Sequence, residues 1–257
     1  MGLPRKLGQH FLVSQSILEK LAQAACGDHV PCVIEIGPGR GALTRHLLPR
    51  TGELHAIEID TTLADFLQRE FASEPKLHVH QADVLSIDLA QWGEAAIAGN
   101  LPYYITSPII RKFLELNQPF RSAVFLVQRV VADRLLANPG TRDYGYLTVI
   151  TRIVCDVELV CHVPPGAFSP PPKVESAAVR LNRKASQPAN TEELLTFIGR
   201  CFAQKRKTLR NNLRPFYGSA IEGMPQARLR AEQLTVQQFE DLLNALKHAA
   251  ERKPPVH

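Results

Sequence analysis

The chain has 257 residues, of which 45% are hydrophobic and 21% are charged, a composition that indicates an ordinary globular protein and excludes a disordered one. No apolar run reaches the roughly 18 residues of a membrane span, and no apolar signal region follows Met1. We therefore expect a cytoplasmic protein with no membrane partner. Five cysteines without a C-x-x-C pair argue against a disulfide framework and against a structural zinc site, so we expect no metal.

The formal charge of +5 is unevenly distributed along the chain. Residues 1–183 contain 18 Lys and Arg and 18 Asp and Glu, whereas residues 184–257 contain 12 and 7. All of the excess positive charge therefore lies in the last third. A basic segment beside a neutral body favours a polyanionic partner.

In chain order, apolar spacing over residues 14–26 predicts a helix that ends at Gly27. Strands are then predicted at 33–36, 54–58, 77–79, 95–98 and 123–127, with helices between them, notably at 62–71 and 108–116. This alternation is typical of an α/β fold with a doubly wound sheet. Two β-rich runs at 153–160 and 174–181, on either side of a proline-rich loop, are expected to complete the sheet as antiparallel edge elements.

The polar stretch 183–190 indicates a linker between two domains. Beyond it, helical patterns occupy residues 192–202, 205–213, 228–233 and 236–248. The sequence therefore predicts a Rossmann-like catalytic domain over residues 1–183 and a small all-α domain over residues 184–257.

A glycine turn, Glu35-Ile-Gly-Pro-Gly-Arg-Gly41, follows the first predicted strand of the sheet. Such a turn lets a ligand approach a backbone that side chains would otherwise block. Gly37, Gly39 and Ala42 also fit the dinucleotide pattern G-x-G-x-x-G/A, so the motif alone leaves NAD and S-adenosylmethionine open.

Three acidic residues shift the balance towards S-adenosylmethionine. Glu35, at the end of its strand, can orient the turn and face the cationic methionine group of that cofactor. Glu58, about 20 residues after the turn, stands where a carboxylate can accept both ribose hydroxyls. Asp83, after the third strand, can accept a hydrogen bond from an adenine amino group.

The sharpest signal is Asn100-Leu-Pro-Tyr103, at the end of the fourth predicted strand. The amino nitrogen of adenine is a poor nucleophile because its lone pair is delocalised into the ring. Acceptors on its N–H groups relieve that delocalisation, and the Asn100 side-chain oxygen and the Leu101 carbonyl are suitable acceptors in a turn that Pro102 holds rigid. The lone pair could then attack the sulfonium methyl in line, a displacement for which the enzyme mainly supplies positioning.

Two aromatic residues are candidates for holding the target base. Tyr103 can stack on an extruded adenine. Phe168, in Phe168-Ser-Pro-Pro-Pro-Lys-Val174, is presented by a stiff proline loop that suits an aromatic clamp, although an aromatic there is more commonly a packing residue.

Several motifs in order along nearly the whole chain closely resemble the KsgA (RsmA) family of ribosomal RNA adenine dimethyltransferases. They are Gly8-Gln-His-Phe-Leu12, Glu35-Ile-Gly-Pro-Gly39, Ile57-Glu-Ile-Asp60, Asn100-Leu-Pro-Tyr103, Phe168-Ser-Pro-Pro-Pro-Lys-Val-Glu-Ser176 and Gln204-Lys-Arg-Lys-Thr-Leu-Arg-Asn-Asn-Leu213. The chain departs from this family at His10 and Tyr104, where the family often has Asn.

The resemblance implies that the chain methylates two adjacent adenosines near the 3′ end of small-subunit ribosomal RNA twice each, during late assembly of the subunit. It assigns contacts with S-adenosylmethionine to His10, Leu12, Gly37, Glu58, Asp83 and Asn100. It places Phe11 near the cofactor and the target base, with Tyr103 and Phe168 on either side of the adenine. We expect a monomer, because no apolar stripe is left unexplained.

The basic segment 200–214 contains no acidic residue and suits contacts with RNA phosphates. Its candidate RNA-binding residues are Arg200, Lys205, Arg206, Lys207 and Arg210, together with Arg214. The predicted helical period would spread these charges around a helix, so only some of them could touch RNA at once.

Three alternatives remain at this point. A resistance methyltransferase that acts on large-subunit ribosomal RNA would share the cofactor and the Asn-Leu-Pro-Tyr turn. The chain could also act mainly as a subunit assembly factor. A nicotinamide dehydrogenase would need an acid–base pair for hydride transfer, for which the sequence offers no candidate.

Overall fold

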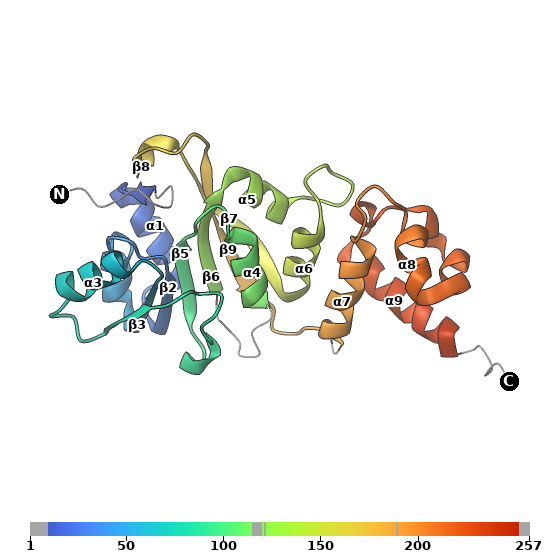
Figure 1. Cartoon of the computed structure of the whole chain (residues 1–257), viewed down its shortest axis with the longest axis horizontal. Coiled ribbons are helices and arrows are strands. Elements are labelled where there is room, and N and C mark those ends of the chain that lie inside the picture. Colours follow the sequence, from blue (N-terminus) through green and yellow to red (C-terminus); the bar gives the residue numbers. More distant parts are fainter. Residues whose placement is uncertain (1–9, 115–119, 121, 189, 252–257) are drawn as a thin grey trace. The chain divides into compact units, whose positions relative to one another are not determined.

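The computed structural model describes residues 10–114, 120, 122–188 and 190–251 of the chain, which divides into two compact units (Figure 1). The first, the sheet unit, comprises Met1–Ala132 and Asp156–Arg183, and the second, the helical unit, comprises Asp133–Cys155 and Lys184–His257. This division differs from the expected one because residues 133–155 group with the C-terminal helices and not with the catalytic domain.

The contacts of residues 133–155 explain that difference. Tyr144 is 1% exposed, and its hydroxyl donates to the carbonyl of Leu234 at 2.7 Å. Helix α6, Tyr146–Val154, packs against two helices of the C-terminal segment. Its sequence is rich in β-branched residues, which favour strands, but burial of its apolar side chains within the helical unit outweighs that propensity.

The sheet unit is built on seven strands in the order β4-β3-β2-β5-β6-β9-β7. The first five are parallel to their neighbours, and β9 is antiparallel to β6. The strands are β2 Val30–Ile36, β3 Thr51–Glu58, β4 Leu77–Gln81, β5 Ala96–Asn100, β6 Ser122–Gln128, β7 Cys155–Val163 and β9 Ser176–Arg183. Within this sheet the chain begins at β2, continues through β3 to the edge strand β4, and then returns to β5 on the other side of β2. The carboxyl ends of β2 and β5 therefore border the crevice in which doubly wound sheets bind ligands.

Helices cover both faces of this sheet (Figure 1). Leu18 and Leu21 of α1 share a buried cluster with Val124 and Leu126 of β6. Phe125, the residue between those two, points to the other face, where its ring lies 5.1 Å from that of Phe113 in α4. The helical elements of this unit are α1 Gln15–Cys26, α2 Thr44–Leu47, η1 Leu48–Arg50, α3 Thr61–Glu70, η2 Ala90–Trp92, α4 Thr106–Leu114, η3 Pro165–Ala167 and the start of α5 Arg129–Leu136.

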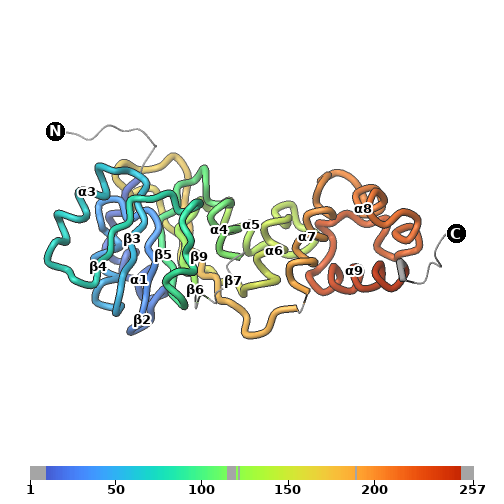
Figure 2. The backbone as a smooth tube through the Cα atoms, turned by 60° about the horizontal axis from the view of Figure 1, so that its bottom comes forward, coloured from blue at the N-terminus to red at the C-terminus, as the bar shows by residue number. Residues whose placement is uncertain are grey.

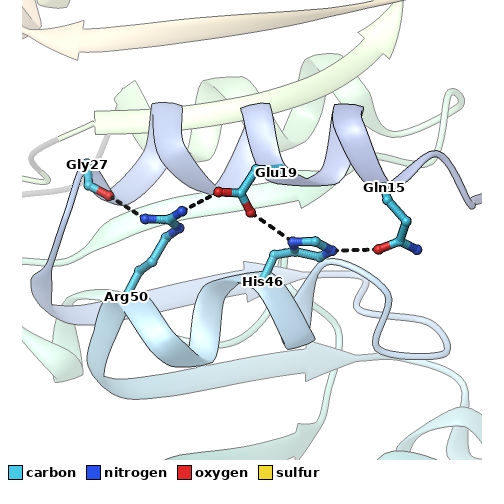
Figure 3. Close-up of polar contacts among 5 residues, drawn as sticks. All are labelled: Gln15, Glu19, Gly27, His46 and Arg50. Carbon is cyan, nitrogen blue, oxygen red and sulfur yellow. Dashed lines mark hydrogen bonds and ion pairs between the residues drawn. The ribbon is translucent and has the colours of Figure 1, made fainter.

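Polar contacts fasten α1 to the segment α2–η1 (Figure 3). The ring of His46 contacts Glu19 through Nδ1 and Gln15 through Nε2, each at 3.0 Å. Arg50 pairs with Glu19 and also donates to the carbonyl of Gly27 at 3.2 Å. These contacts hold α1 against the segment that follows the loop between β2 and α2.

A two-stranded ladder joins segments that are far apart in sequence. Strand β1, Phe11–Leu12, pairs antiparallel with β8, Phe168–Ser169, so that Leu12 faces Phe168. No periodicity signals strands of two residues, and the sequence analysis did not anticipate this pairing.

The helical unit contains α6, α7 Thr191–Cys201, α8 Leu209–Tyr217 and α9 Val236–Glu251, and α7 contacts both α8 and α9 (Figure 2). Three short 3-10 turns complete it: η4 Gly218–Gly223, η5 Pro225–Arg228 and η6 Ala231–Gln233. Two predictions are corrected here. Residues 205–208 form a turn before α8, and residues 228–233 form 3-10 turns, because neither stretch has enough apolar contacts on one side to hold an α-helix.

The other sequence predictions differ mainly at element ends. The strand predicted from residue 153 begins at Cys155, and helices α5 and α6 were missed. Residues 115 and 116 of the predicted 108–116 helix, and Gly8 and Gln9, lie outside the described residues. Within the described ranges, no helix is long and apolar enough to cross a membrane, and no group of three or more metal-binding side chains occurs. All five cysteines are free thiols.

Candidate active site

A cavity of about 470 Å³ lies in the sheet unit, at the carboxyl ends of β2, β3 and β5. Small-molecule and cofactor sites commonly have this size. Nine residues that the sequence predicted for the site line it: His10, Leu12, Gly37, Glu58, Asp83, Asn100, Leu101, Pro102 and Tyr103. The cavity thus brings together residues that are up to about 90 positions apart in the chain.

The glycine turn forms one wall of the cavity with its backbone. Gly37 and Gly39 have φ angles of +65° and +59°, a region that other residues rarely adopt. A side chain on Gly39 would bring its Cβ to 3.0 Å from the ring of Phe11. That ring carries the Arg40 guanidinium 5.0 Å from its centroid. Glycine at both positions allows these backbone angles, and at position 39 it also avoids a close contact with Phe11.

Two buried carboxyl groups face this wall. Glu58 is 5% exposed and accepts the Gly39 N–H through Oε2 and the Asp60 N–H through Oε1, each at 3.0 Å. Burial raises the pKa of Glu58. Glu35, at 1% exposed, accepts the Thr44 hydroxyl at 2.6 Å, and burial raises its pKa to about 8. Both acids lack a cationic partner within the part of the chain that the structure describes.

Asp83 lies after β4, also on the cavity lining. Its Oδ1 accepts the Leu85 N–H at 2.9 Å, which fixes the carboxylate and leaves Oδ2 for a ligand. Asp83 lies just past the end of β4, the strand next to β3. From this position its carboxylate can accept a hydrogen bond from the amino group of a bound base.

The Asn100-Leu-Pro-Tyr103 turn leaves β5 at the crevice. Asn100 Nδ2 donates to the His10 carbonyl at 3.1 Å, so Oδ1 is the amide atom that remains as an acceptor. The Leu101 N–H donates to Leu126 at 3.1 Å. The Pro102 carbonyl accepts from Thr106 Oγ1 at 3.1 Å and from the Ile105 N–H at 3.2 Å. The bond to His10 orients the side-chain amide of Asn100, while the other bonds hold the backbone of the turn.

Tyr103 is held at both ends of its side chain. Its hydroxyl lies 2.9 Å from Ser176 Oγ, and its ring stacks with that of His10 at 6.2 Å between centroids. His10 Nδ1 donates in turn to the Pro170 carbonyl at 2.8 Å. Sequence reasoning missed Ser176 and Thr44, because only the fold brings these hydroxyls to residues distant in the chain.

Phe168 is the exception among the predicted site residues. It is 4% exposed, belongs to the buried cluster around α1, and does not line the cavity. The β1–β8 ladder turns its side chain into the core, while its neighbour Ser169 lines the cavity. The expectation that the proline loop presents this ring to the base is therefore not met in this structure.

The predicted basic residues lie in the helical unit, but not on one helix. Lys205, Arg206 and Lys207 are exposed in the turn between α7 and α8. Arg200 lies in the last turn of α7, with its guanidinium 4.4 Å from the Phe216 ring centroid. Arg210 and Arg214 both approach Glu222, at 3.8 and 3.7 Å, so an acidic residue from outside the segment partly neutralises them.

A doubly wound sheet, a glycine turn, a carboxylate after the second parallel strand and the Asn-Leu-Pro-Tyr turn together define a Rossmann-like methyltransferase fold. Comparison with known proteins gives the family. A family model described as ribosomal RNA adenine dimethylase matches residues 3–250. The chain therefore belongs to the ribosomal RNA adenine dimethylase family, and it is an S-adenosylmethionine-dependent methyltransferase.

Individual relatives agree along most of the chain. It is 39% identical to the ribosomal RNA small subunit methyltransferase A of Chlorobium chlorochromatii, with 96% of this chain and 95% of that protein covered. It is 41% identical to the protein of the same name from Acidobacterium capsulatum, with 94% and 90% covered. The resemblance inferred from the motifs is thereby confirmed, and the nicotinamide interpretation of the glycine turn is set aside.

Solved structures show the same fold. A dimethyladenosine transferase from Plasmodium falciparum superposes with a TM-score of 0.81 at 28% identity, covering 94% of this chain and 98% of that one. The 23S rRNA methyltransferase ErmE superposes with a TM-score of 0.69 at 30% identity, covering 92% and 99%.

Proposed function

We propose that this enzyme dimethylates the N6 amino groups of two adjacent adenosines near the 3′ end of small-subunit ribosomal RNA, using S-adenosylmethionine, during late assembly of the small subunit. It would act in the cytoplasm, where its substrate is assembled, as a monomer. The main support for the proposed methyl transfer is the hydrogen bond from Asn100 to the His10 carbonyl, because it leaves Oδ1 of Asn100 as an acceptor at the cavity. The names of the relatives support small-subunit ribosomal RNA as the substrate.

The residues present fit the cofactor. The cavity size, the side-chain-free wall at Gly37 and Gly39, and the lack of a cationic partner for Glu35 and Glu58 among the described residues match a nucleoside with a positively charged amino-acid tail. Glu58 would accept the ribose hydroxyls, Asp83 the adenine amino group, and Glu35 the positive charge. When bound, S-adenosylmethionine supplies a methyl group on a positively charged sulfur.

The remaining chemistry falls to the turn after β5. Asn100 Oδ1 and the Leu101 carbonyl would accept the two N–H groups of the target amine and so localise its lone pair. Tyr103, fixed by Ser176 and His10, would stack on the base. The methylated nitrogen is cationic and acidic, so its proton can pass to water without a dedicated base.

RNA binding by the helical unit is a separate part of the proposal. Lys205, Arg206 and Lys207 are exposed and form no ion pair within the described part of the chain, whereas Arg210 and Arg214 share Glu222. Replacing the three turn residues by Gln should weaken RNA binding about equally for all sequences and reduce the salt dependence by roughly one counterion for each phosphate that is no longer bound. Cofactor affinity should not change. An unaltered salt dependence would contradict this role.

The decisive experiment incubates the protein with labelled S-adenosylmethionine and either undermethylated small ribosomal subunits or large-subunit ribosomal RNA, followed by identification of the modified nucleoside. We expect dimethyladenosine in the small-subunit RNA and none with the Asn100→Ala variant. The control variant is His162→Gln, on an exposed position of β7. Product in the large-subunit RNA alone would reject the substrate assignment in favour of the activity that ErmE is named for.

The assembly role is distinguishable from catalysis. Subunit maturation rescued by the Asn100→Ala variant as well as by the wild type would make binding to the immature subunit the primary function. Rescue by the wild type alone would tie maturation to methylation.

A further inference from the structure

Glu35 lines the cavity and forms a buried pair with Thr44, which lies outside the lining. Thr44 is 0% exposed, and its hydroxyl donates to Glu35 Oε2 at 2.6 Å. The backbone N–H of Thr44 also stabilises the charged form of this carboxyl. Thr44 therefore occupies Oε2 from the protein side, and Oε1 is the oxygen left for a ligand.

The charges around Glu35 do not stabilise its ionised form. Burial is the main cause that raises its pKa to about 8, and the charge of Glu58 on the neighbouring strand β3 raises it further, while Thr44 lowers it. The other titratable residues on the cavity lining are His10, Arg40, Asp83, Tyr103 and Tyr104. Of these, Arg40 is the permanent cation, and its guanidinium lies over the Phe11 ring. A carboxyl group in this setting holds a proton at neutral pH.

A cationic ligand reverses that balance. A positive charge near Oε1 favours the carboxylate, so the proton must leave when the ligand arrives. The step is balanced: the carboxylic acid of Glu35 gives its proton to solvent, and the carboxylate that remains pairs with the ligand cation. The hydroxyl of Thr44 keeps donating to Oε2 in both states, so the carboxylate forms without a rotation of its side chain.

We propose that Thr44 is a positioning residue that holds Glu35 towards the cavity, and that this pair couples binding of the cofactor to the release of one proton. This inference rests on the proposed function, because it takes the ligand to be a cationic nucleoside. It predicts that cofactor affinity rises with pH until Glu35 is ionised in the ligand-free protein as well.

Calorimetric titration of the purified protein with S-adenosylmethionine, in buffers of different ionisation enthalpy, measures the protons released. At pH 7 we expect close to one proton, and at pH 9 about a tenth of one. The Glu35→Gln variant should release none and bind more weakly at both pH values. S-adenosylhomocysteine, which lacks the sulfonium charge, serves as the second probe and should release fewer protons than S-adenosylmethionine.

Thr44→Val tests the positioning role. It should raise the dissociation constant and the KM for the cofactor about tenfold, with little change in kcat at saturating cofactor, and it should move the pH dependence of binding upward. Thr44→Ser, which keeps the hydroxyl, should have the cofactor affinity and the pH dependence of the wild type. The control is Thr51→Val, which removes an equally buried hydroxyl from β3, away from the cavity.

The outcomes separate this inference from the proposed function. A wild type that binds no S-adenosylmethionine would overturn the proposed function itself. Binding without proton release at pH 7 would overturn the coupling alone. Unchanged affinity and pH dependence in Thr44→Val would overturn the positioning role. If Thr44→Val does not fold, Thr44→Ala, which also lacks the hydroxyl, takes its place with the same expected result, and the proton count of the wild type decides the coupling by itself.

Discussion

The histidine cluster at the outer strands makes the sheet unit sensitive to acid. His55 of β3 is 7% exposed, its Nδ1 lies 3.0 Å from His80 Nε2, and its ring stacks on Trp92 with centroids 4.5 Å apart. The pKa of His55 is lowered to about 4, mainly by burial and also by the charges of His80 and His78, against an opposing effect of Glu53. The pKa of His80 is lowered as well, by burial and by His78.

The magnitude follows from proton linkage. An unfolded histidine binds a proton near pH 6.5, whereas the folded His55 binds one only near pH 4. Protonation therefore favours the unfolded chain, and the protein loses unfolding free energy as the pH falls from 6.5 towards 4. For His55 alone, the loss between pH 7 and pH 5 is about 2 kcal/mol. Glu35 acts in the opposite direction, because its raised pKa destabilises the fold at neutral pH and this cost shrinks on acidification.

The wild type and the His55→Phe variant both contain Glu35, so a comparison of their unfolding free energies cancels its contribution. Urea unfolding at pH 7 and pH 5 is followed by the fluorescence of Trp92, the single tryptophan, which reports on the sheet unit. The free energy of unfolding of His55→Phe should fall by about 2 kcal/mol less than that of the wild type between these pH values. The control, His162→Phe at an exposed position, should follow the wild type. A variant whose loss equals that of the wild type would refute the reasoning.

Three further predictions concern the site and its supports. In Asn100→Asp a carboxylate replaces the amide that donates to the His10 carbonyl, so the rate of single-turnover methylation should fall about 100-fold. A variant that keeps half of the wild-type rate would contradict the assigned role. Gly99→Ala would place a Cβ 2.6 Å from the Ile36 carbonyl, and we expect a loss of about 1–3 kcal/mol in unfolding free energy, with Gly166→Ala, whose Cβ meets nothing within 4 Å, as the control. Cys161 is the half-exposed member of the five thiols, so a disulfide-exchange reagent should modify one cysteine in the native protein and five after unfolding; rapid modification of several native thiols would oppose this burial pattern.

Strong periodic patterns let the sequence predict the parallel core of the fold. The strands around residues 33–36, 54–58 and 123–127 are rich in apolar residues and alternate with helical patterns, and their order implies a crevice after β2 and β5. Seven of the nine predicted site residues on the cavity lining end or follow a strand of that core, whereas His10 and Leu12 belong to the segment at β1. The local pattern and the global fold agree at these positions.

Predictions failed where tertiary contacts decide the local structure. The β-branched helix α6 is held by its packing in the helical unit. The proline-rich sequence around Phe168 predicts an exposed loop aromatic, but a two-residue ladder with Leu12 turns that ring into the core. Glu222, which partly neutralises Arg210 and Arg214, lies outside the basic segment 200–214. None of these partners can be found from spacing along the chain.

His10 shows how a departure from the family pattern can leave the reacting turn intact. The atom that orients Asn100 is the backbone carbonyl of His10, which any residue at that position supplies. Its ring has a different task, since Nδ1 donates to the Pro170 carbonyl and the face stacks on Tyr103. The amide of Asn100 and the ring of Tyr103 are thus set by one residue through separate groups. A change of side chain at this position would alter how the base platform is held while the acceptor that the amine needs stays in place.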